Sequence, residues 1–143
     1  GVQNALIIRA RDAEDEETLD HSTVLTILNH FTAQATVEAA NLCHNAARFF
    51  LARARNRADF ETALTLIVLA IDKYGRSGNW HHRAAATHWQ SVAYERLGEK
   101  EEDAKARTQA RQLWEKAVEL DPSNKGFLQN LENERKRETE LVS

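Results

Sequence analysis

A stretch in which small and aromatic residues recur at helical spacing constrains the fold of this chain most. Ala110, Trp114 and Ala117 are four and three residues apart, so they lie on one face of a helix. Small residues on such a face allow a second helix to cross closely, and the tryptophan fills the space that remains. Pro122 ends the helix, because the residue before a proline is pushed out of the helical region. The pattern predicts a helix over about 100–120 that packs against other helices.

Most of the chain carries a similar helical periodicity. Only one Pro and five Gly occur among the 143 residues, which leaves little material for turns or strands. Gly98 is expected to end one helix and to form, with Leu97, the turn before the next. That next helix is expected to include Leu120 in its apolar face. The predicted helices span about residues 22–33, 36–56, 60–74, 80–97, 100–120 and 124 onwards.

Charge divides the chain into two predicted parts. Residues 11–20 carry six acidic residues against a single basic residue, Arg11. We expect residues 1–21 to form a solvated acidic N-terminal arm, or alternatively a regulatory tail that competes for a basic groove. Residues 22–140 are expected to form one helical domain, in which a C-terminal capping helix begins at about residue 124.

The order of these landmarks resembles the tetratricopeptide-repeat (TPR) family over roughly residues 36–140. The residues that carry the resemblance are Tyr94, Leu97, Gly98, Ala110, Trp114, Ala117, Asp121 and Pro122. The family stacks helix–turn–helix units on one another. The resemblance implies an all-α fold of antiparallel helix pairs stacked as a short right-handed TPR-like solenoid, with about six helices. Ala63 and Ala110 are 47 residues apart, against a family period of about 34, so one pair is expected to be longer than usual.

One further interpretation of the fold and two of the function stay open. Residues 58–64 also resemble the second helix of the microtubule-interacting and transport domain, a small three-helix domain that binds helical tails. An enzyme accessory domain with a small-molecule pocket between helices is an alternative function, with His81, His88 and Trp89 at the pocket. A self-associating structural domain is the other alternative, through Trp80, Phe127 and Leu128.

The function that the resemblance implies is a non-catalytic protein–protein interaction module, one part of a larger protein or assembly. The chain has no Gly-rich phosphate loop, no His-Glu-x-x-His zinc motif and no nucleophile motif. We therefore expect no enzyme activity and no catalytic residues. We also expect no cofactor and no metal, because the spacings of the six His residues match no zinc site.

Overall charge and hydropathy limit the class of partner. The formal net charge of −3 is too small to attract nucleic acid or an anionic membrane by itself. No apolar run approaches the roughly 20 residues that cross a bilayer. We expect a protein or peptide partner, no nucleic acid, no membrane insertion and a cytoplasmic location. The chain contains no Met, so we expect a processed piece from which targeting segments could have been removed.

A basic cluster marks the predicted binding site. Residues 48–57 contain four arginines and no acidic residue. On a helix over 36–56, Asn45, Arg48 and Arg55 would share one face. In the family that the chain resembles, the first helix of each pair lines a concave groove. The partner-binding residues implied are Asn45, Arg48, Arg55, His88, Trp89 and Val92.

The chemistry of that face indicates what it would bind. Guanidinium groups are suited to carboxylates, so we expect an acidic peptide or partner protein. The alternative is a solvated basic face that pairs with the acidic residues 12–20 of the same chain.

Overall fold

The computed structural model describes residues 36–141. The predicted helix at 22–33 and the acidic arm at 1–21 lie outside the described residues. Within them there are five helices and no strand, which confirms the all-α prediction. The helices are α3 (Val37–Ala52), α4 (Arg57–Arg76), α5 (Trp80–Leu97), α6 (Lys100–Leu120) and α7 (Lys125–Glu140).

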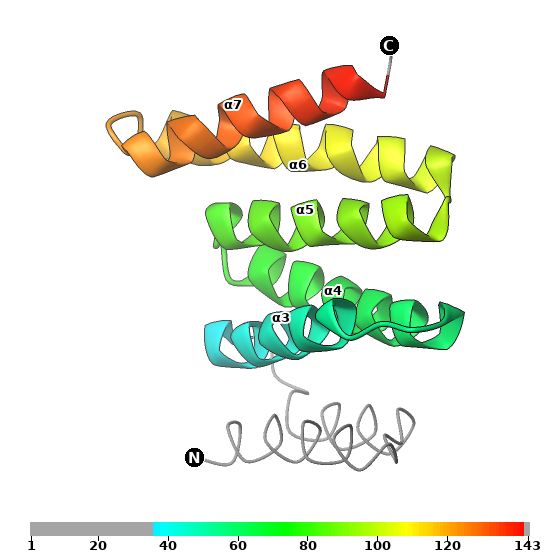
Figure 1. Ribbon diagram of the computed structural model, residues 1–143. Coiled ribbons are helices and arrows are strands. Elements are labelled where there is room, and N and C mark those ends of the chain that lie inside the picture. Colours follow the sequence, from blue (N-terminus) through cyan, green and yellow to red (C-terminus); the bar gives the residue numbers. More distant parts are fainter. Residues whose placement is uncertain (1–35, 142–143) are drawn as a thin grey trace.

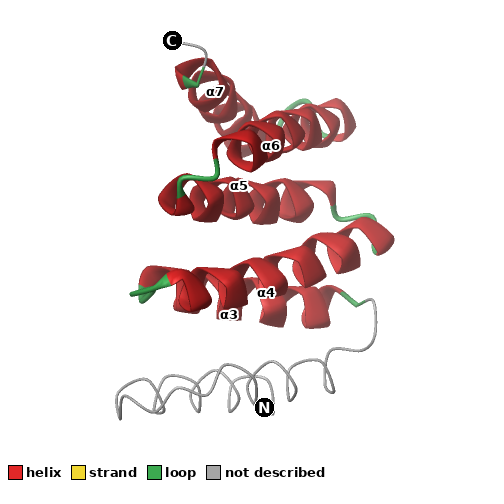
Figure 2. Ribbon diagram, turned by 90° about the vertical axis from the view of Figure 1, so that its right-hand side faces the viewer, coloured by secondary structure: helices red, strands yellow, loops and turns green. Residues whose placement is uncertain are grey.

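Consecutive helices pack as antiparallel pairs. The links between them are two to four residues long, so each helix must turn back along the one before it. α3 packs on α4, α4 on α5, α5 on α6, and α6 on α7, and α3 also touches α5 (Figure 1). The view turned by 90° shows the same order, with α3 and α4 at one end and α7 at the other (Figure 2). α5 therefore lies in the middle of the described domain.

The boundary between α3 and α4 differs from the prediction. α3 ends at Ala52 rather than near residue 56, and α4 begins at Arg57 rather than at residue 60. Asn56 explains the early start, because its side-chain oxygen accepts a hydrogen bond from the backbone N–H of Asp59 at 3.1 Å. Such a cap satisfies an amide group that has no partner within the helix. The residues predicted as a turn thus form the first turn of α4.

The other boundaries follow the predicted turn signals closely. Gly98 ends α5 in the left-handed conformation, with φ of +74°, as predicted. Leu97 is the last residue of α5, so the turn into α6 consists of Gly98 and Glu99 and not of Leu97 and Gly98. Asp121, just before Pro122, ends α6. α4 continues one residue past Gly75, and Gly78, with φ of +73°, forms the following turn.

Small residues are buried between the packed helices. Ala63, Ala70 and Ala110 are fully buried, and Trp114 is 5% exposed beside Ala117. Burial of these alanines and of the tryptophan is what the spacing predicted. Leu120 does not share this burial: it is 62% exposed, because it is the last residue of α6, where the chain turns away into α7.

None of the helices in residues 36–141 is both long enough and apolar enough to cross a membrane.

Candidate partner-binding groove

A cavity of about 410 Å³ lies where α3 faces α5. Five of its lining residues come from the C-terminal half of α3 and two from α5. Basic and apolar side chains line it, and no acidic residue does. The lining residues are Asn45, Arg48, Phe49, Leu51, Ala52, Trp89 and Arg96. We call this cavity the α3–α5 groove.

Arg48 is held on the groove by an aromatic ring. Its guanidinium carbon lies 4.8 Å from the centroid of the Trp89 ring, within the range of a cation–π interaction. Arg48 is exposed and Trp89 is half-buried. Among the described residues, Arg48 has no ion-pair partner. The stacking restricts the guanidinium while leaving its N–H donors at the edge available to an anion.

Arg96 supplies a second guanidinium from α5. Its Nη1 donates a hydrogen bond of 3.2 Å to the backbone carbonyl of Leu51, near the C-terminal end of α3. A cation at that end is favoured, because the last carbonyls of a helix carry partial negative charge. No carboxylate in the described part of the chain pairs with Arg96. The groove thus holds two exposed guanidiniums, each anchored by a neutral group.

The remaining wall of the groove is apolar. Phe49 is half-buried and packs edge-to-face with Phe50, with ring centroids 5.8 Å apart. The guanidinium carbon of Arg53 lies 3.9 Å from the centroid of the Phe49 ring, and its Nη1 donates to the Phe49 carbonyl. Leu51 is 2% exposed and belongs to the core beneath. The groove therefore combines cationic groups with an aromatic and aliphatic surface.

His44 lies next to the groove in sequence and is neutral. Burial, followed by the positive charge of Arg48 and by His82, lowers the pKa of His44 to about 4. Its side chain is buried, and its Nε2 has no hydrogen-bond partner in the described residues. The positive charge of the groove at neutral pH is therefore that of its arginines.

The structure brings together three of the six predicted partner-binding residues. Asn45, Arg48 and Trp89 line the groove together. Val92 instead packs on the core cluster between α3, α4 and α5. His88 contacts the Trp89 ring edge-on, but its Nδ1 lies 2.5 Å from Oε1 of Glu134 on α7. His88 and Val92 are thus next to the groove and do not line it.

Arg55 does not share the face predicted for it. α3 ends at Ala52, so Arg55 lies in the link to α4. There its backbone N–H donates a hydrogen bond of 2.7 Å to Oδ2 of Asp59. The helical spacing that placed it beside Arg48 does not apply beyond the helix end. Arg57, in the same basic cluster, pairs with Glu61 at 3.1 Å and with Glu99 at 2.8 Å.

The prediction missed Arg96, together with Phe49, Leu51 and Ala52 as lining residues. A signal for Arg96 was present, because it follows Trp89 by seven residues and so lies two turns further along the same face of α5. The apolar residues of α3 carried no signal, since their periodicity is that of any core-facing helix.

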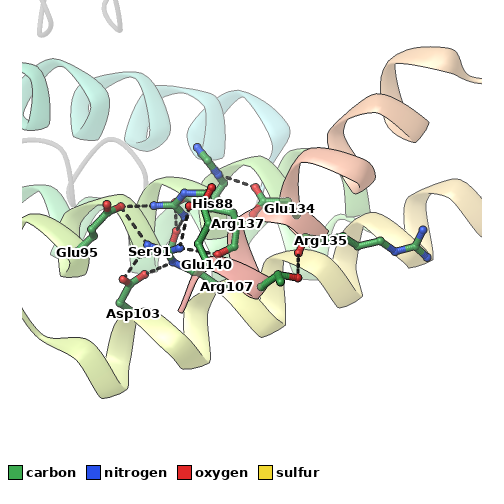
Figure 3. A network of polar contacts seen from close by, with 10 residues as sticks. His88, Ser91, Glu95, Asp103, Arg107, Glu134, Arg135, Arg137 and Glu140 are labelled. Atoms are coloured by element: carbon green, nitrogen blue, oxygen red, sulfur yellow. Dashed lines mark hydrogen bonds and ion pairs between the residues drawn. The ribbon is translucent and has the colours of Figure 1, made fainter. Parts of the chain in front are cut away.

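A second group of charged residues joins α5, α6 and α7 (Figure 3). Arg107 and Asp103 on α6 are both buried and form two hydrogen bonds, Nε to Oδ1 at 2.9 Å and Nη2 to Oδ2 at 3.1 Å. Nη1 of Arg107 also donates to the backbone carbonyl of Arg137 on α7 at 2.6 Å. We call this group, with the α5 residues it reaches, the α5–α7 network.

Arg137 and His88 complete the α5–α7 network. Arg137 donates to the hydroxyl of Ser91 and, at 2.5 Å, to Oε2 of Glu95, both on α5. The pair of His88 and Glu134 is a further polar link from α5 to α7. These contacts fix the last described helix against the two before it.

The residues of the two alternative functions have separate neighbours. His81 stacks on Phe127 of α7 with centroids 4.8 Å apart, so His81, His88 and Trp89 do not form one pocket. Trp80 and Phe127 are half-buried against the α5–α6–α7 core, and Leu128 is 44% exposed. In residues 36–141 there is no group of three or more His, Cys, Asp or Glu side chains that could hold a metal ion.

Comparisons of the chain with models of protein families, with curated proteins and with solved structures found no match. The resemblance to tetratricopeptide repeats therefore stays a prediction, based on the residues named above.

Proposed function

We propose that this protein is a non-catalytic, TPR-like interaction module that binds an acidic segment of a partner protein in the α3–α5 groove. One observation carries the proposal: Arg48 and Arg96 line the groove without a carboxylate partner among the described residues. Elsewhere in the described chain, a buried arginine and several exposed ones form ion pairs. Two anchored guanidiniums with spare donors are suited to carboxylates.

The helix pairing supports the repeat-like part of the proposal. Alanines of α4 and of α6 are buried where these helices pack, namely Ala63, Ala70, Ala110 and Ala117. Stacked helix pairs place alternate helices side by side, and α3 touches α5 while α5 is linked to α7. A short right-handed solenoid, as part of a larger protein or assembly, is the arrangement that we propose on this basis.

Nucleic acid suits the groove less well than a peptide does. Single-stranded nucleic acid binds through bases stacked on exposed aromatic rings. Arg48 already covers the face of Trp89 at 4.8 Å. A base would have to displace Arg48, whereas a carboxylate can use it in place.

The test is a binding measurement with acidic peptides and matched variants. A panel of capped acidic peptides is titrated against the wild type, Arg48→Ala/Arg96→Ala and Arg76→Ala/Arg135→Ala, with fluorescence anisotropy as readout. The control pair removes the same two positive charges at exposed sites outside the groove, where Arg76 pairs with Asp72 and Arg135 with Glu115. We expect the groove variant alone to lose binding. Equal loss in both variants would reduce the interaction to general charge attraction and contradict the groove assignment.

A small carboxylate-bearing ligand is the second candidate, favoured by the cavity volume. A volume of about 410 Å³ falls within the range of small-molecule pockets, about 300–1,000 Å³. Thermal-shift measurements with succinate and glutarate separate the two candidates. A shift of several degrees that Arg48→Ala/Arg96→Ala abolishes would favour the small ligand, since a ligand stabilises the state that it binds.

A further inference from the structure

We infer that the α3–α5 groove recognises an acidic side chain placed next to a large apolar one, and not a run of acidic residues alone. The carboxylate would lie between Arg48 and Arg96, and the apolar side chain against Phe49 and Ala52. This inference depends on the proposed function, because it specifies the partner of the same groove.

The two guanidiniums define the acidic half of the motif. Arg48 is restricted by the ring of Trp89, and Arg96 by its hydrogen bond to the Leu51 carbonyl. A guanidinium has five N–H donors, and each of these contacts uses at most one of them. Because both groups are anchored before a ligand arrives, less side-chain entropy is lost on binding than for free surface arginines.

The apolar wall defines the other half. Four of the seven lining residues are apolar, which is more than an acidic run would use. Phe49 is half-buried and Ala52 is exposed, so a ligand could cover apolar surface that now faces water. Removing apolar surface from water contributes about 25 cal/mol per Å², and a purely acidic segment would forgo this contribution.

The amide of Asn45 indicates that the acidic and apolar side chains belong to a peptide. It is exposed at the groove, and its side chain has no hydrogen-bond partner among residues 36–141. An amide side chain both donates and accepts, as a peptide backbone does. An isolated carboxylate would use only the donor.

The experiment compares the binding of three short capped peptides to the full chain. In the first, Asp alternates with Leu; in the second, Asn replaces Asp; in the third, Ser replaces Leu. Each is titrated by fluorescence anisotropy, and the intrinsic tryptophan emission is followed in parallel with Trp89→Phe as its control. We expect the Asp–Leu peptide to bind at least tenfold more tightly than either other peptide, and to change an emission signal that Trp89→Phe removes.

A second variant tests the groove without a change that is expected to unfold the protein. Ala52→Glu places a carboxylate in the groove at an exposed helix end. It should therefore lower the affinity for the Asp–Leu peptide at least tenfold, while the circular dichroism spectrum stays unchanged. Equal affinity of the Asp–Leu and Asp–Ser peptides would overturn the combined motif but leave the acidic-segment proposal in place. Equal affinity of the Asp–Leu and Asn–Leu peptides, or no binding by any peptide, would overturn both.

Discussion

The α3–α5 groove and the α5–α7 network are both rich in arginine but use it in opposite ways. In the network, Arg107 pairs with Asp103, and Arg137 with Glu95. In the groove, Arg48 stacks on an aromatic ring and Arg96 donates to a backbone carbonyl, and neither has a carboxylate partner among residues 36–141. Arginines that already have carboxylates hold the helices together, and arginines that lack them remain available for a ligand. Pairing, and not the number of charges, separates the two regions.

Burial explains why the two regions differ. Arg107 is 3% exposed, and a charge taken out of water is tolerated only with a well-placed opposite charge. Arg48 and Arg96 are exposed, so water can satisfy their unused donors until a partner replaces it. α5 takes part in both regions, with Trp89 and Arg96 toward α3 and with Ser91 and Glu95 toward α7.

The largest effect is expected from breaking the network. Arg107→Ala leaves the carboxylate of Asp103 buried without its partner, so we expect a loss of about 3–5 kcal/mol in the free energy of unfolding. Urea denaturation followed by circular dichroism measures it. The double variant Asp103→Leu/Arg107→Met removes both charges and should recover most of that loss. A single variant that unfolds at the wild-type urea concentration would show that the pair is dispensable.

A somewhat smaller effect is expected from pH, through His44. Its pKa is about 4 in the folded chain against an ordinary value of 6.5, so the unfolded chain binds a proton more readily. The contribution of neutral His44 to the free energy of unfolding is nearly complete above about pH 6.5 and is lost as the pH falls toward 4. This group alone should cost about 2 kcal/mol by pH 5, out of about 3 kcal/mol in total.

The variant that isolates His44 is His44→Leu, which cannot be protonated. Urea midpoints between pH 7 and pH 5 should fall clearly less in His44→Leu than in the wild type. The pKa values of His81 and His82 are also lowered by burial, so some decline should remain in the variant. Identical pH profiles for the two proteins would contradict the lowered pKa of His44 in the folded chain.

In the groove, single substitutions should affect binding and spare stability. Charge-assisted hydrogen bonds contribute about 1.5–3 kcal/mol each to binding. Arg48→Ala and Arg96→Ala should therefore each lower the affinity for the Asp–Leu peptide by about tenfold or more. Because both side chains are exposed, the thermal midpoint should stay close to that of the wild type. A large drop in that midpoint would place these arginines with the network, as structural groups.

The sequence predicted the helices better than it predicted their contacts. Helical periodicity, Gly98 and Pro122 set α5 and α6 to the residue, because each of these signals acts locally. The network was not predicted, since Arg107 and Asp103 resemble any exposed i, i+4 pair until α7 covers them. Three of the seven lining residues of the groove were among the predicted residues, Asn45, Arg48 and Trp89.

The smallest effect is expected at Arg55, and it decides between sequence spacing and structure. A helix over residues 36–56 would place Arg55 on the face of Arg48, with the same tenfold effect on binding. The end of α3 at Ala52 places Arg55 in the link instead, outside the groove lining. Arg55→Ala should then change the affinity for the Asp–Leu peptide by less than about twofold, as an exposed charge screened over about 10 Å at 0.1 M salt. Anisotropy titrations of Arg48→Ala and Arg55→Ala in the same buffer make the comparison. A tenfold loss with Arg55→Ala would mean that the partner-binding face continues past the end of α3.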